Sequence, residues 1–136
     1  MAEIAEKYRL FVIEDNRTEG MLLQLALAEI EGLEIKTFPN GQSMLERLHE
    51  IPDIAIVDLI LPDMSGMDLI KQIKAKSPHT RIVVVSAQRN IELIAELQAE
   101  GIFNYLVKSE ACLAYLHHVI EDLIIVIEHR NEPKNS

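Results

Sequence analysis

Polar side chains that could do chemistry stand directly after several apolar runs of the sequence. Glu14 and Asp15 follow "LFVI", and Asp58 follows "IAIV". Ser86 ends "RIVVVS", and Lys108 ends "FNYLVK". Three carboxylates that lie close together disfavour full ionisation unless a cation compensates them. A hard divalent ion suits such a cluster, above all Mg²⁺, which often completes its coordination with a phosphate oxygen. The pattern therefore predicts a magnesium site that also receives a phosphoryl group.

These side chains meet only if the apolar runs are strands of one parallel sheet. Five segments have strand character, and three of them are nearly continuous apolar runs, as in strands covered on both faces. The five segments are Leu10–Glu14, Leu33–Phe38, Ile54–Leu59, Arg81–Ala87 and Phe103–Lys108. The second is mixed in polarity and indicates an edge strand. Helical patterns alternate with these segments, which predicts a doubly wound α/β fold whose ligands bind beyond the carboxyl ends of the strands.

The predicted helices have expected boundaries and expected buried faces. Asn16 and Asn90 are the predicted N-caps of the first and fourth helices, and Gly101 is the predicted left-handed stop of the fourth. The last helix is expected to begin near Ser109 and to run to about Arg130. The first helix is expected to bury a stripe formed by Met21, Leu22, Leu25, Ala28 and Ile30.

The last helix is more apolar than one buried face requires. One stripe is expected to face the sheet: Leu113, Leu116, Ile120, Leu123 and Ile127. A second stripe lies beside it: Cys112, Tyr115, Val119 and Val126. The second stripe is either covered by the domain itself or indicates a partner helix, and we favour a homodimer or a lead-in to an output domain. His117 and His118 of this helix are interpreted as solvated residues.

Length and composition indicate one ordinary globular domain. The 136 residues are divided into an extension at 1–8, a domain at 9–130 and a frayed tail or linker start at 131–136. Thirteen Lys and Arg against 22 Asp and Glu give a net charge of −9, which disfavours nucleic-acid binding by this chain. Cys112 is the single cysteine, which excludes an intramolecular disulfide and favours a cytoplasmic location. The first residues printed are charged and lack the apolar core expected of a secretory signal, and no stretch of the sequence is apolar for long enough to be expected to span a membrane.

Three common kinds of phosphate site are excluded by residue type. The first strand is not followed by a glycine-rich turn, so neither a dinucleotide fingerprint nor a P-loop is present. A flavodoxin-type cofactor phosphate would be repelled by Glu14 and Asp15. Each acid alone is explained equally well as a helix cap or turn residue, Ser86 alone as a plain strand end, and Lys108 alone as a surface lysine. It is their occurrence at one edge of the sheet that indicates a site.

In order and spacing, the motifs resemble the receiver domain of bacterial two-component response regulators. The segment "VIEDN" resembles the acidic pair of that family, and "VDLILPDMSGMDLI" resembles its phospho-acceptor loop. The segment "VVVSA" resembles the strand that ends in a hydroxyl, and "GIFNYLVK" the aromatic-x-x-Lys segment. The resemblance covers Leu10 to about Ile127. It implies a five-stranded parallel sheet with five helices and the flavodoxin-like strand order 2-1-3-4-5, which the chemotaxis regulator shares.

The resemblance implies a phospho-accepting signalling domain rather than an enzyme. Asp58 would take a phosphoryl group from the phosphohistidine of a sensor histidine kinase or phosphotransfer protein. Mg²⁺ would be held by Asp15 and Asp58, by Glu14 directly or through water, and by the backbone carbonyl of Ile60.

The resemblance also implies roles for residues on the fourth and fifth strands. Lys108 would pair with one phosphoryl oxygen, and the Ser86 hydroxyl would bond another. Tyr105 would be the aromatic residue whose rotamer follows the state of the site. The surface formed by the fourth helix, fifth strand and fifth helix would then change on phosphorylation. The family usually has proline after this lysine, commonly in a cis bond, whereas Ser109 follows here, so the sequence leaves the geometry of this bond open.

Two other functions are alternatives to a phospho-accepting receiver. A degenerate receiver would bind partners without phosphorylation, and it is expected to lose the acids or the lysine, none of which is lost. A Mg²⁺-dependent phosphatase with an Asp nucleophile usually has an acid two residues after it, where this chain has Ile60. Such phosphatases also usually carry a cap domain, for which the chain has no room.

Ile60 and Gln88 occupy positions that tune the phosphoryl lifetime in receivers, but the sequence does not give that lifetime.

Overall fold

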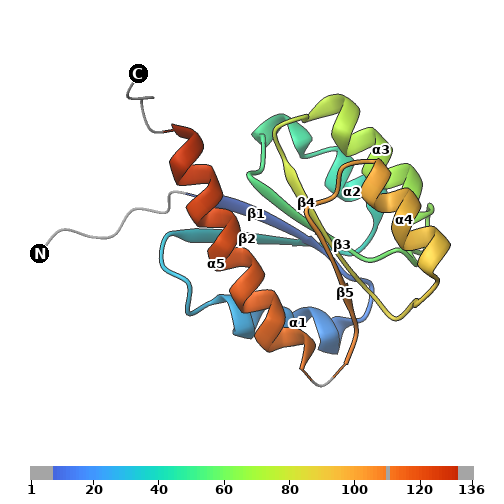
Figure 1. Cartoon of the computed structure of the whole chain (residues 1–136), viewed down its shortest axis with the longest axis horizontal. Helices are drawn as coiled ribbons and strands as arrows, with labels where there is room; N and C mark the ends of the chain where they lie inside the picture. Colours follow the sequence, from blue (N-terminus) through green and yellow to red (C-terminus); the bar gives the residue numbers. More distant parts are fainter. Residues whose placement is uncertain (1–7, 110, 132–136) are drawn as a thin grey trace, which may run out of the picture.

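A parallel five-stranded sheet forms the centre of the molecule (Figure 1). The computed structural model describes residues 8–109 and 111–131. The strands are β1 (Tyr8–Ile13), β2 (Leu33–Phe38), β3 (Ile54–Val57), β4 (Arg81–Ser86) and β5 (Asn104–Val107). Their order is β2-β1-β3-β4-β5, and every neighbouring pair is parallel. The predicted strand order is confirmed, and β2 lies at an edge as its mixed polarity predicted.

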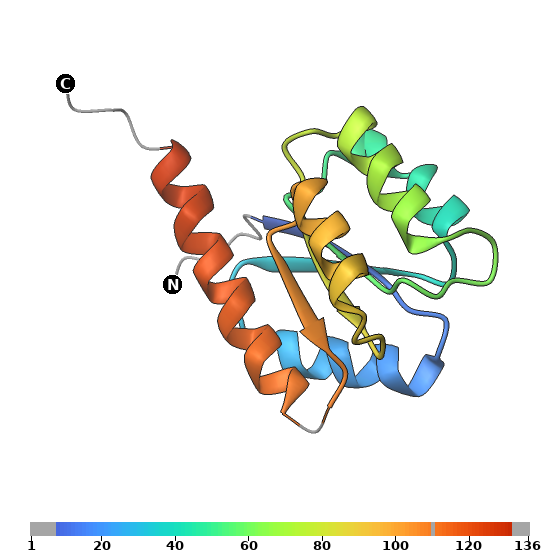
Figure 2. The ribbon, with the colours of Figure 1, turned by 45° about the vertical axis from the view of Figure 1, so that its right-hand side comes forward.

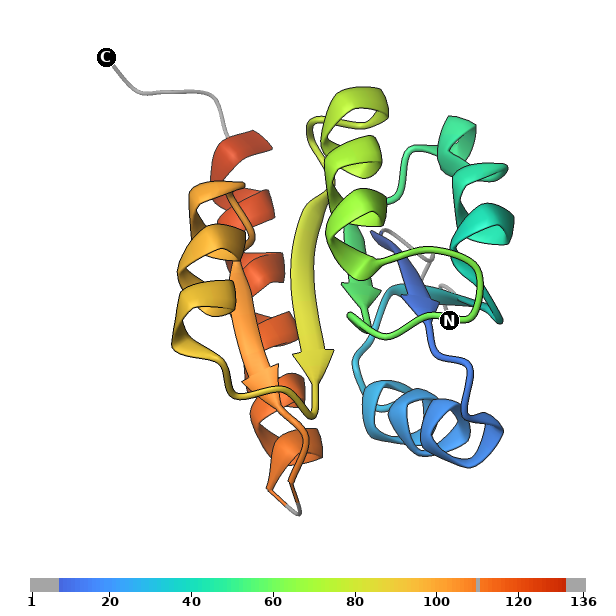
Figure 3. The same ribbon diagram turned by 90° about the vertical axis from the view of Figure 1, so that its right-hand side faces the viewer.

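Within the described residues, five α-helices cover the two faces of this sheet. They are α1 (Arg17–Leu27), α2 (Gly41–Leu45), α3 (Gly66–Lys76), α4 (Ile91–Ala99) and α5 (Cys112–Asn131). A short 3₁₀ helix spans Leu48–Glu50. Helices α2, α3 and α4 cover one face, and α1 and α5 cover the other (Figures 2 and 3). This two-sided cover is what repeated right-handed βαβ crossovers produce.

The helix boundaries follow local signals that the sequence contains. The Asn16 side chain accepts a hydrogen bond from the Glu19 amide at the start of α1. The Asn90 side chain accepts hydrogen bonds from the amides of Glu92 and Leu93 at the start of α4. Gly101 follows α4 with a φ of +91°, so the predicted caps and the predicted stop are confirmed. The predicted start of the last helix near Ser109 was too early, since α5 begins at Cys112.

Two apolar clusters lie on opposite faces of the sheet because successive residues of a strand point to opposite sides. On β1, Phe11 belongs to the cluster beneath α2, α3 and α4, whereas Leu10 belongs to the cluster beneath α1 and α5. Both side chains are fully buried, as are most residues of β3 and β4. The sheet is therefore a rigid support whose carboxyl ends hold the polar residues singled out above.

The buried face of α1 differs from the predicted one. Leu23 and Leu27, four residues apart, face the sheet and α5 and are nearly fully buried. Met21, Leu22 and Leu25 are instead 57%, 47% and 68% exposed. Of the other residues of the predicted stripe, Ala28 is exposed and Ile30 is half-buried. The prediction was wrong because apolar residues occupy most of the circumference of this helix, so periodicity alone did not identify its inner face.

The two apolar stripes of α5 have different surroundings. The first stripe packs against the sheet and α1, with Leu116, Ile120 and Leu123 fully buried. The second stripe is divided, since Cys112 is buried but Tyr115 is 61% exposed. A homodimer through this helix stays a prediction. Among the described residues, none of the helices has the length and hydropathy needed to cross a membrane.

Candidate functional site

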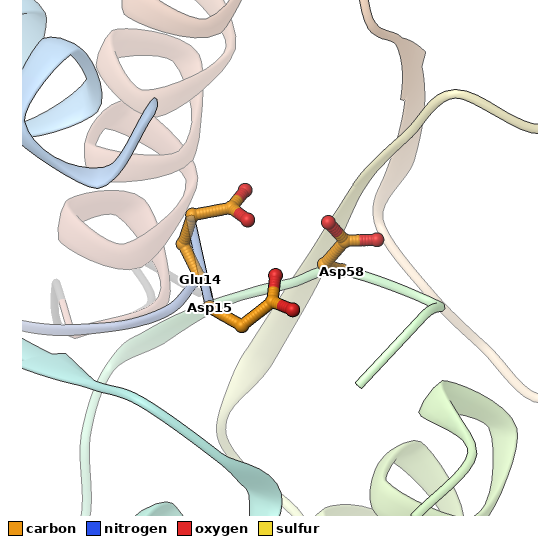
Figure 4. Close-up of side chains that lie close together, drawn as sticks. All are labelled: Glu14, Asp15 and Asp58. Atoms are coloured by element: carbon orange, nitrogen blue, oxygen red, sulfur yellow. The ribbon is translucent and has the colours of Figure 1, made fainter. Parts of the chain in front are cut away.

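Three carboxylates converge beyond the carboxyl ends of β1 and β3 (Figure 4). One oxygen from each of Glu14, Asp15 and Asp58 lies within 4.8 Å of the others. The sheet register explains this, because Val12 pairs with Ile56, so that two residues later Glu14 is level with Asp58. The side chains of Glu14 and Asp58 are only 4% and 8% exposed, whereas Asp15 faces solvent. The predicted cluster is therefore present, and its open side is at Asp15.

Lys108 places its ammonium group against this cluster. Its Nζ donates hydrogen bonds to Asp58 Oδ2 at 2.8 Å and to Glu14 Oε2 at 3.1 Å. Its backbone amide bonds to the Ser86 carbonyl at 2.9 Å, which fixes the lysine at the end of β5. Burial alone would lower the pKa of Lys108, but the hydrogen bonds to carboxylates outweigh burial and raise that pKa. The ammonium is therefore charged and positioned beside Asp58.

Glu19 is a further partner of Lys108 that the sequence did not indicate. Lys108 Nζ donates to Glu19 Oε2 at 2.7 Å, the shortest of its three hydrogen bonds to carboxylates. Glu19 lies in the first turn of α1, where an acid is also explained by the helix dipole. The two residues are 89 positions apart, so no local pattern could have linked them.

The carboxyl edge of the sheet around Glu14, Asp15, Glu19, Asp58 and Lys108 is called the rim below. The electrostatics of the rim favour the binding of a cation. Burial raises the pKa of Glu14, although hydrogen bonds from the Asn16 amide and from Lys108 oppose that rise. Four carboxylates, those of Glu14, Asp15, Glu19 and Asp58, lie here with a single ammonium group, so the rim carries excess negative charge. Carboxylate oxygens are the ligands that Mg²⁺ prefers. Oxygens around an octahedral Mg²⁺ lie about 3 to 4.2 Å apart, so small side-chain movements would suffice, and the residues fit this ion.

The loop after β3 is closed tightly behind Asp58. The Ile60 amide donates to Asp58 Oδ1 at 3.1 Å, and the Gly66 amide donates to the Leu59 carbonyl at 2.9 Å. A Cβ atom on Gly66 would lie 2.5 Å from Leu59 Cα and 2.9 Å from the Asp58 carbonyl oxygen. Gly66 is therefore required by the close approach of two backbone segments. The hydrogen bond from the Ile60 amide holds the Asp58 carboxylate in place.

The tip of this loop is bound to the N-terminus of α2. The two carboxylate oxygens of Asp63 accept hydrogen bonds from the Gly41 and Gln42 amides, each at 2.9 Å. These backbone hydrogen bonds hold the pKa of Asp63 below its usual value. The Met64 side chain packs so closely on Gly41 that a Cβ there would lie 2.6 Å from its sulfur. The loop is thus fixed at both its base and its tip.

Ser86 and Tyr105 adjoin the rim but are bonded elsewhere. Ser86 is fully buried at the end of β4, and its Oγ accepts a hydrogen bond from the Gln88 amide at 3.3 Å. The half-buried Tyr105 donates its hydroxyl hydrogen to the Gln88 carbonyl at 2.7 Å. One peptide segment thus connects these two residues. Within the described residues every peptide bond is trans, so the Lys108–Ser109 bond, which the sequence left open, is trans.

A protein-family model matches most of the chain. The model described as "Response regulator receiver domain" matches residues 10–121 of the chain. The chain belongs to this family. Receiver domains take phosphate from histidine kinases in two-component signalling, and they are phosphoacceptors rather than enzymes. The cluster of Glu14, Asp15 and Asp58 is of the type that binds Mg²⁺ in receiver domains and is consistent with a phosphoacceptor site.

Curated relatives of this receiver domain are longer regulators. It is 33% identical over 99 residues to the DNA-binding transcriptional regulator NtrC of Escherichia coli K12, covering 72% of this chain and 21% of the relative. It is 32% identical over 98 residues to the regulatory protein LuxO of Vibrio vulnificus YJ016, covering 71% of this chain and 21% of the relative. The chain thus spans about a fifth of the length of these relatives.

Solved structures share the fold along nearly the whole chain. The signal receiver domain of a putative LuxO repressor protein from Vibrio parahaemolyticus has a TM-score of 0.81 at 23% identity, covering 94% of this chain and 99% of that one. The response regulator TrrA from Thermotoga maritima, solved in complex with Mg²⁺ and BeF, has a TM-score of 0.74 at 26% identity. That match covers 86% of this chain and 99% of TrrA.

Proposed function

We propose that Asp58 is the phospho-acceptor of this receiver domain and receives its phosphoryl group from a sensor histidine kinase or a phosphotransfer protein. The observation that carries the proposal is the position of the Asp58 carboxylate, within 2.8 Å of the Lys108 ammonium and within 4.8 Å of two further carboxylates. A carboxylate can attack a phosphoryl group only where the negative charge of both partners is neutralised. A lysine and a cation site beside one buried carboxylate meet that requirement.

The transfer balances without any further reactant. An oxygen of Asp58 forms a bond to phosphorus, the P–N bond of the phosphohistidine breaks, and the imidazole nitrogen keeps the electron pair. The product is an aspartyl phosphate, a mixed anhydride. Lys108 donates a hydrogen bond to a phosphoryl oxygen, and the closed loop behind Asp58 keeps the attacking oxygen oriented. Loss of the positive charge at Lys108 would leave the phosphoryl charge uncompensated on that side.

Glu14, Asp15 and Asp58 would hold the magnesium ion, with Glu14 acting directly or through a water molecule. The backbone carbonyl of Ile60 would supply a further oxygen ligand, since the loop brings this residue next to Asp58. Bound Mg²⁺ supplies charge neutralisation and orientation of the phosphoryl oxygens. The solvent-facing side at Asp15 leaves space for water and for the incoming phosphoryl group.

The proposed switch passes through the Gln88 peptide. The phosphoryl group adds a charge of about −1.5 to −2 and new acceptor oxygens. The Ser86 hydroxyl would turn to donate to one of these oxygens, which weakens its contact with the Gln88 amide. Because the Tyr105 hydroxyl is bonded to the same residue, the loop after β4 and the surface of α4, β5 and α5 change together.

The domain limits at 9–130, the cytoplasmic location and the homodimer through α5 stay predictions.

Intact-mass spectrometry after incubation with Mg²⁺ and acetyl phosphate tests this proposal. We expect the wild-type chain to gain one phosphate group and Asp58→Asn to gain none. Asp68→Asn is a matched control, because it changes an exposed aspartate in the first turn of α3, and it should phosphorylate like the wild type. A wild-type chain that gains no phosphate would contradict the proposal and favour a degenerate receiver that acts by binding alone.

A further inference from the structure

The Lys108 ammonium group has no hydrogen to spare for a phosphoryl oxygen. An ammonium carries three N–H donors. All three have carboxylate partners here: Glu14 at 3.1 Å, Asp58 at 2.8 Å and Glu19 at 2.7 Å. A phosphoryl oxygen that binds Lys108 must therefore displace one of these carboxylates. The identity of the displaced group determines how readily the domain accepts phosphate.

Glu19 is the partner that can leave. Glu14 and Asp58 extend from strand ends of the rigid sheet, and their side chains are nearly fully buried. The Glu19 side chain comes from α1 and is 44% exposed. It also lines, together with Leu22, Leu23 and Lys108, a pocket of about 240 Å³. This pocket gives the carboxylate open space into which it can turn.

Helix capping does not explain the position of the Glu19 carboxylate. A glutamate at this place in a capping box would reach back to the amide of the N-cap residue. Here the Asn16 amide instead donates to Glu14 Oε1 at 3.2 Å, and Glu19 extends to Lys108. Its backbone amide still donates to the Asn16 side chain, so the helix start is capped without the Glu19 carboxylate.

We propose that Glu19 is a positioning residue that competes with the phosphoryl group for Lys108. It holds the ammonium in place before phosphorylation and releases one N–H when the phosphoryl group arrives on Asp58. This inference rests on the proposed phospho-acceptor role of Asp58. Glu19 lies outside the magnesium cluster and would control how fast the domain takes up phosphate.

The size of the effect follows from the geometry. Glu19 Oε2 and Asp58 Oδ2 bond to the same nitrogen at 2.7 and 2.8 Å, so these two oxygens are at most about 5.5 Å apart. Removing one negative charge at that distance from an incoming group of charge −1 to −2 changes its rate of attachment about 3- to 10-fold, with water-like screening. Glu19→Gln should therefore be phosphorylated about 3- to 10-fold faster than the wild type.

The test compares the wild type, Glu19→Gln and Glu92→Gln in the full chain. Glu92 is a matched control because it is an exposed acid in the first turn of α4, whose amide likewise donates to an asparagine cap. The phosphorylation rate is measured with acetyl phosphate at saturating Mg²⁺, and beryllofluoride affinity is measured by fluorine NMR. We expect both quantities to rise in Glu19→Gln and neither to change in Glu92→Gln.

The direction of the change separates this role from a structural one. Loss of a merely structural ion pair would lower both quantities or leave them unchanged, so an unchanged or slower Glu19→Gln would overturn the inference. An equal rise in Glu92→Gln would also overturn it, because the effect would then reflect net charge alone. A wild-type chain that neither gains phosphate nor binds beryllofluoride would instead contradict the proposed function itself.

Discussion

Replacement of Asp15 by asparagine should stabilise the receiver domain when magnesium is removed. Among the described residues, Lys108 forms ion pairs with Glu14 and Asp58, whereas Asp15 has none. Its carboxylate oxygen nevertheless lies within 4.8 Å of both acids. Asp15→Asn removes this repulsion and keeps the shape of the side chain.

The magnitude follows from Coulomb's law at that separation. Two unit charges 4.8 Å apart in water repel each other by about 0.9 kcal/mol, and salt reduces this value. With two neighbouring acids, we expect Asp15→Asn to stabilise the magnesium-free fold by about 1–2 kcal/mol. An unfolding entropy of about 2.1 cal/mol/K per residue, over 136 residues, converts this gain into a rise in Tm of about 3–7 °C.

Thermal unfolding followed by circular dichroism, first with EDTA and then with excess MgCl₂, measures this change. The wild type should gain stability with magnesium, because an ion that binds only the folded state raises Tm. Asp15→Asn should start higher and gain less. Asp122→Asn is a matched control in which an exposed acid of α5 is changed, with an effect within about 0.5 kcal/mol. A lower Tm for Asp15→Asn in EDTA would refute the reasoning.

Three further predictions concern the fold that supports the site. Leu23 is 3% exposed and Leu25 is 68% exposed. In urea unfolding, Leu23→Ala should therefore destabilise the protein by about 2–5 kcal/mol and Leu25→Ala by no more than about 0.5 kcal/mol. Equal effects of the two variants would contradict the orientation of α1. Gly66→Ala should cost about 1–3 kcal/mol and slow phosphorylation, because its Cβ would lie 2.5 Å from Leu59 Cα; wild-type stability and rate would count against the close contact. Hydrogen bonds from Lys36 and Arg47 lower the pKa of Glu50 from 4.5 to about 2. The stability advantage of the wild type over Glu50→Gln should therefore be full above pH 4.5 and decline as the pH falls toward 2. A difference in denaturant midpoint that does not depend on pH would contradict this.

The sequence predicted the features that depend on local chemistry. Asn16 and Asn90 cap helices because their side chains accept hydrogen bonds from nearby amides, and Gly101 stops a helix because it adopts a positive φ. The rim was predictable because parallel strands place their carboxyl ends at one edge, so Glu14 and Asp58 had to approach each other.

What the sequence did not predict depends on how elements pack in space. The inner face of α1 is set by the sheet and α5, and the apolar residues of the helix, such as Leu25, fitted more than one orientation. The bond between Glu19 and Lys108 joins two elements whose separation only the folded structure defines. Likewise, the Gln88 peptide that connects Ser86 with Tyr105 uses backbone atoms, which residue types do not identify.

Localisation of the phosphoryl group tests the central claim most directly. The domain is incubated with Mg²⁺ and acetyl phosphate, the acyl phosphate is reduced with borohydride, and peptides are sequenced by mass spectrometry. Reduction converts an aspartyl phosphate into homoserine, so we predict homoserine at position 58 and at no other aspartate. Homoserine at Asp15, or phosphate on a residue other than Asp58, would contradict the account.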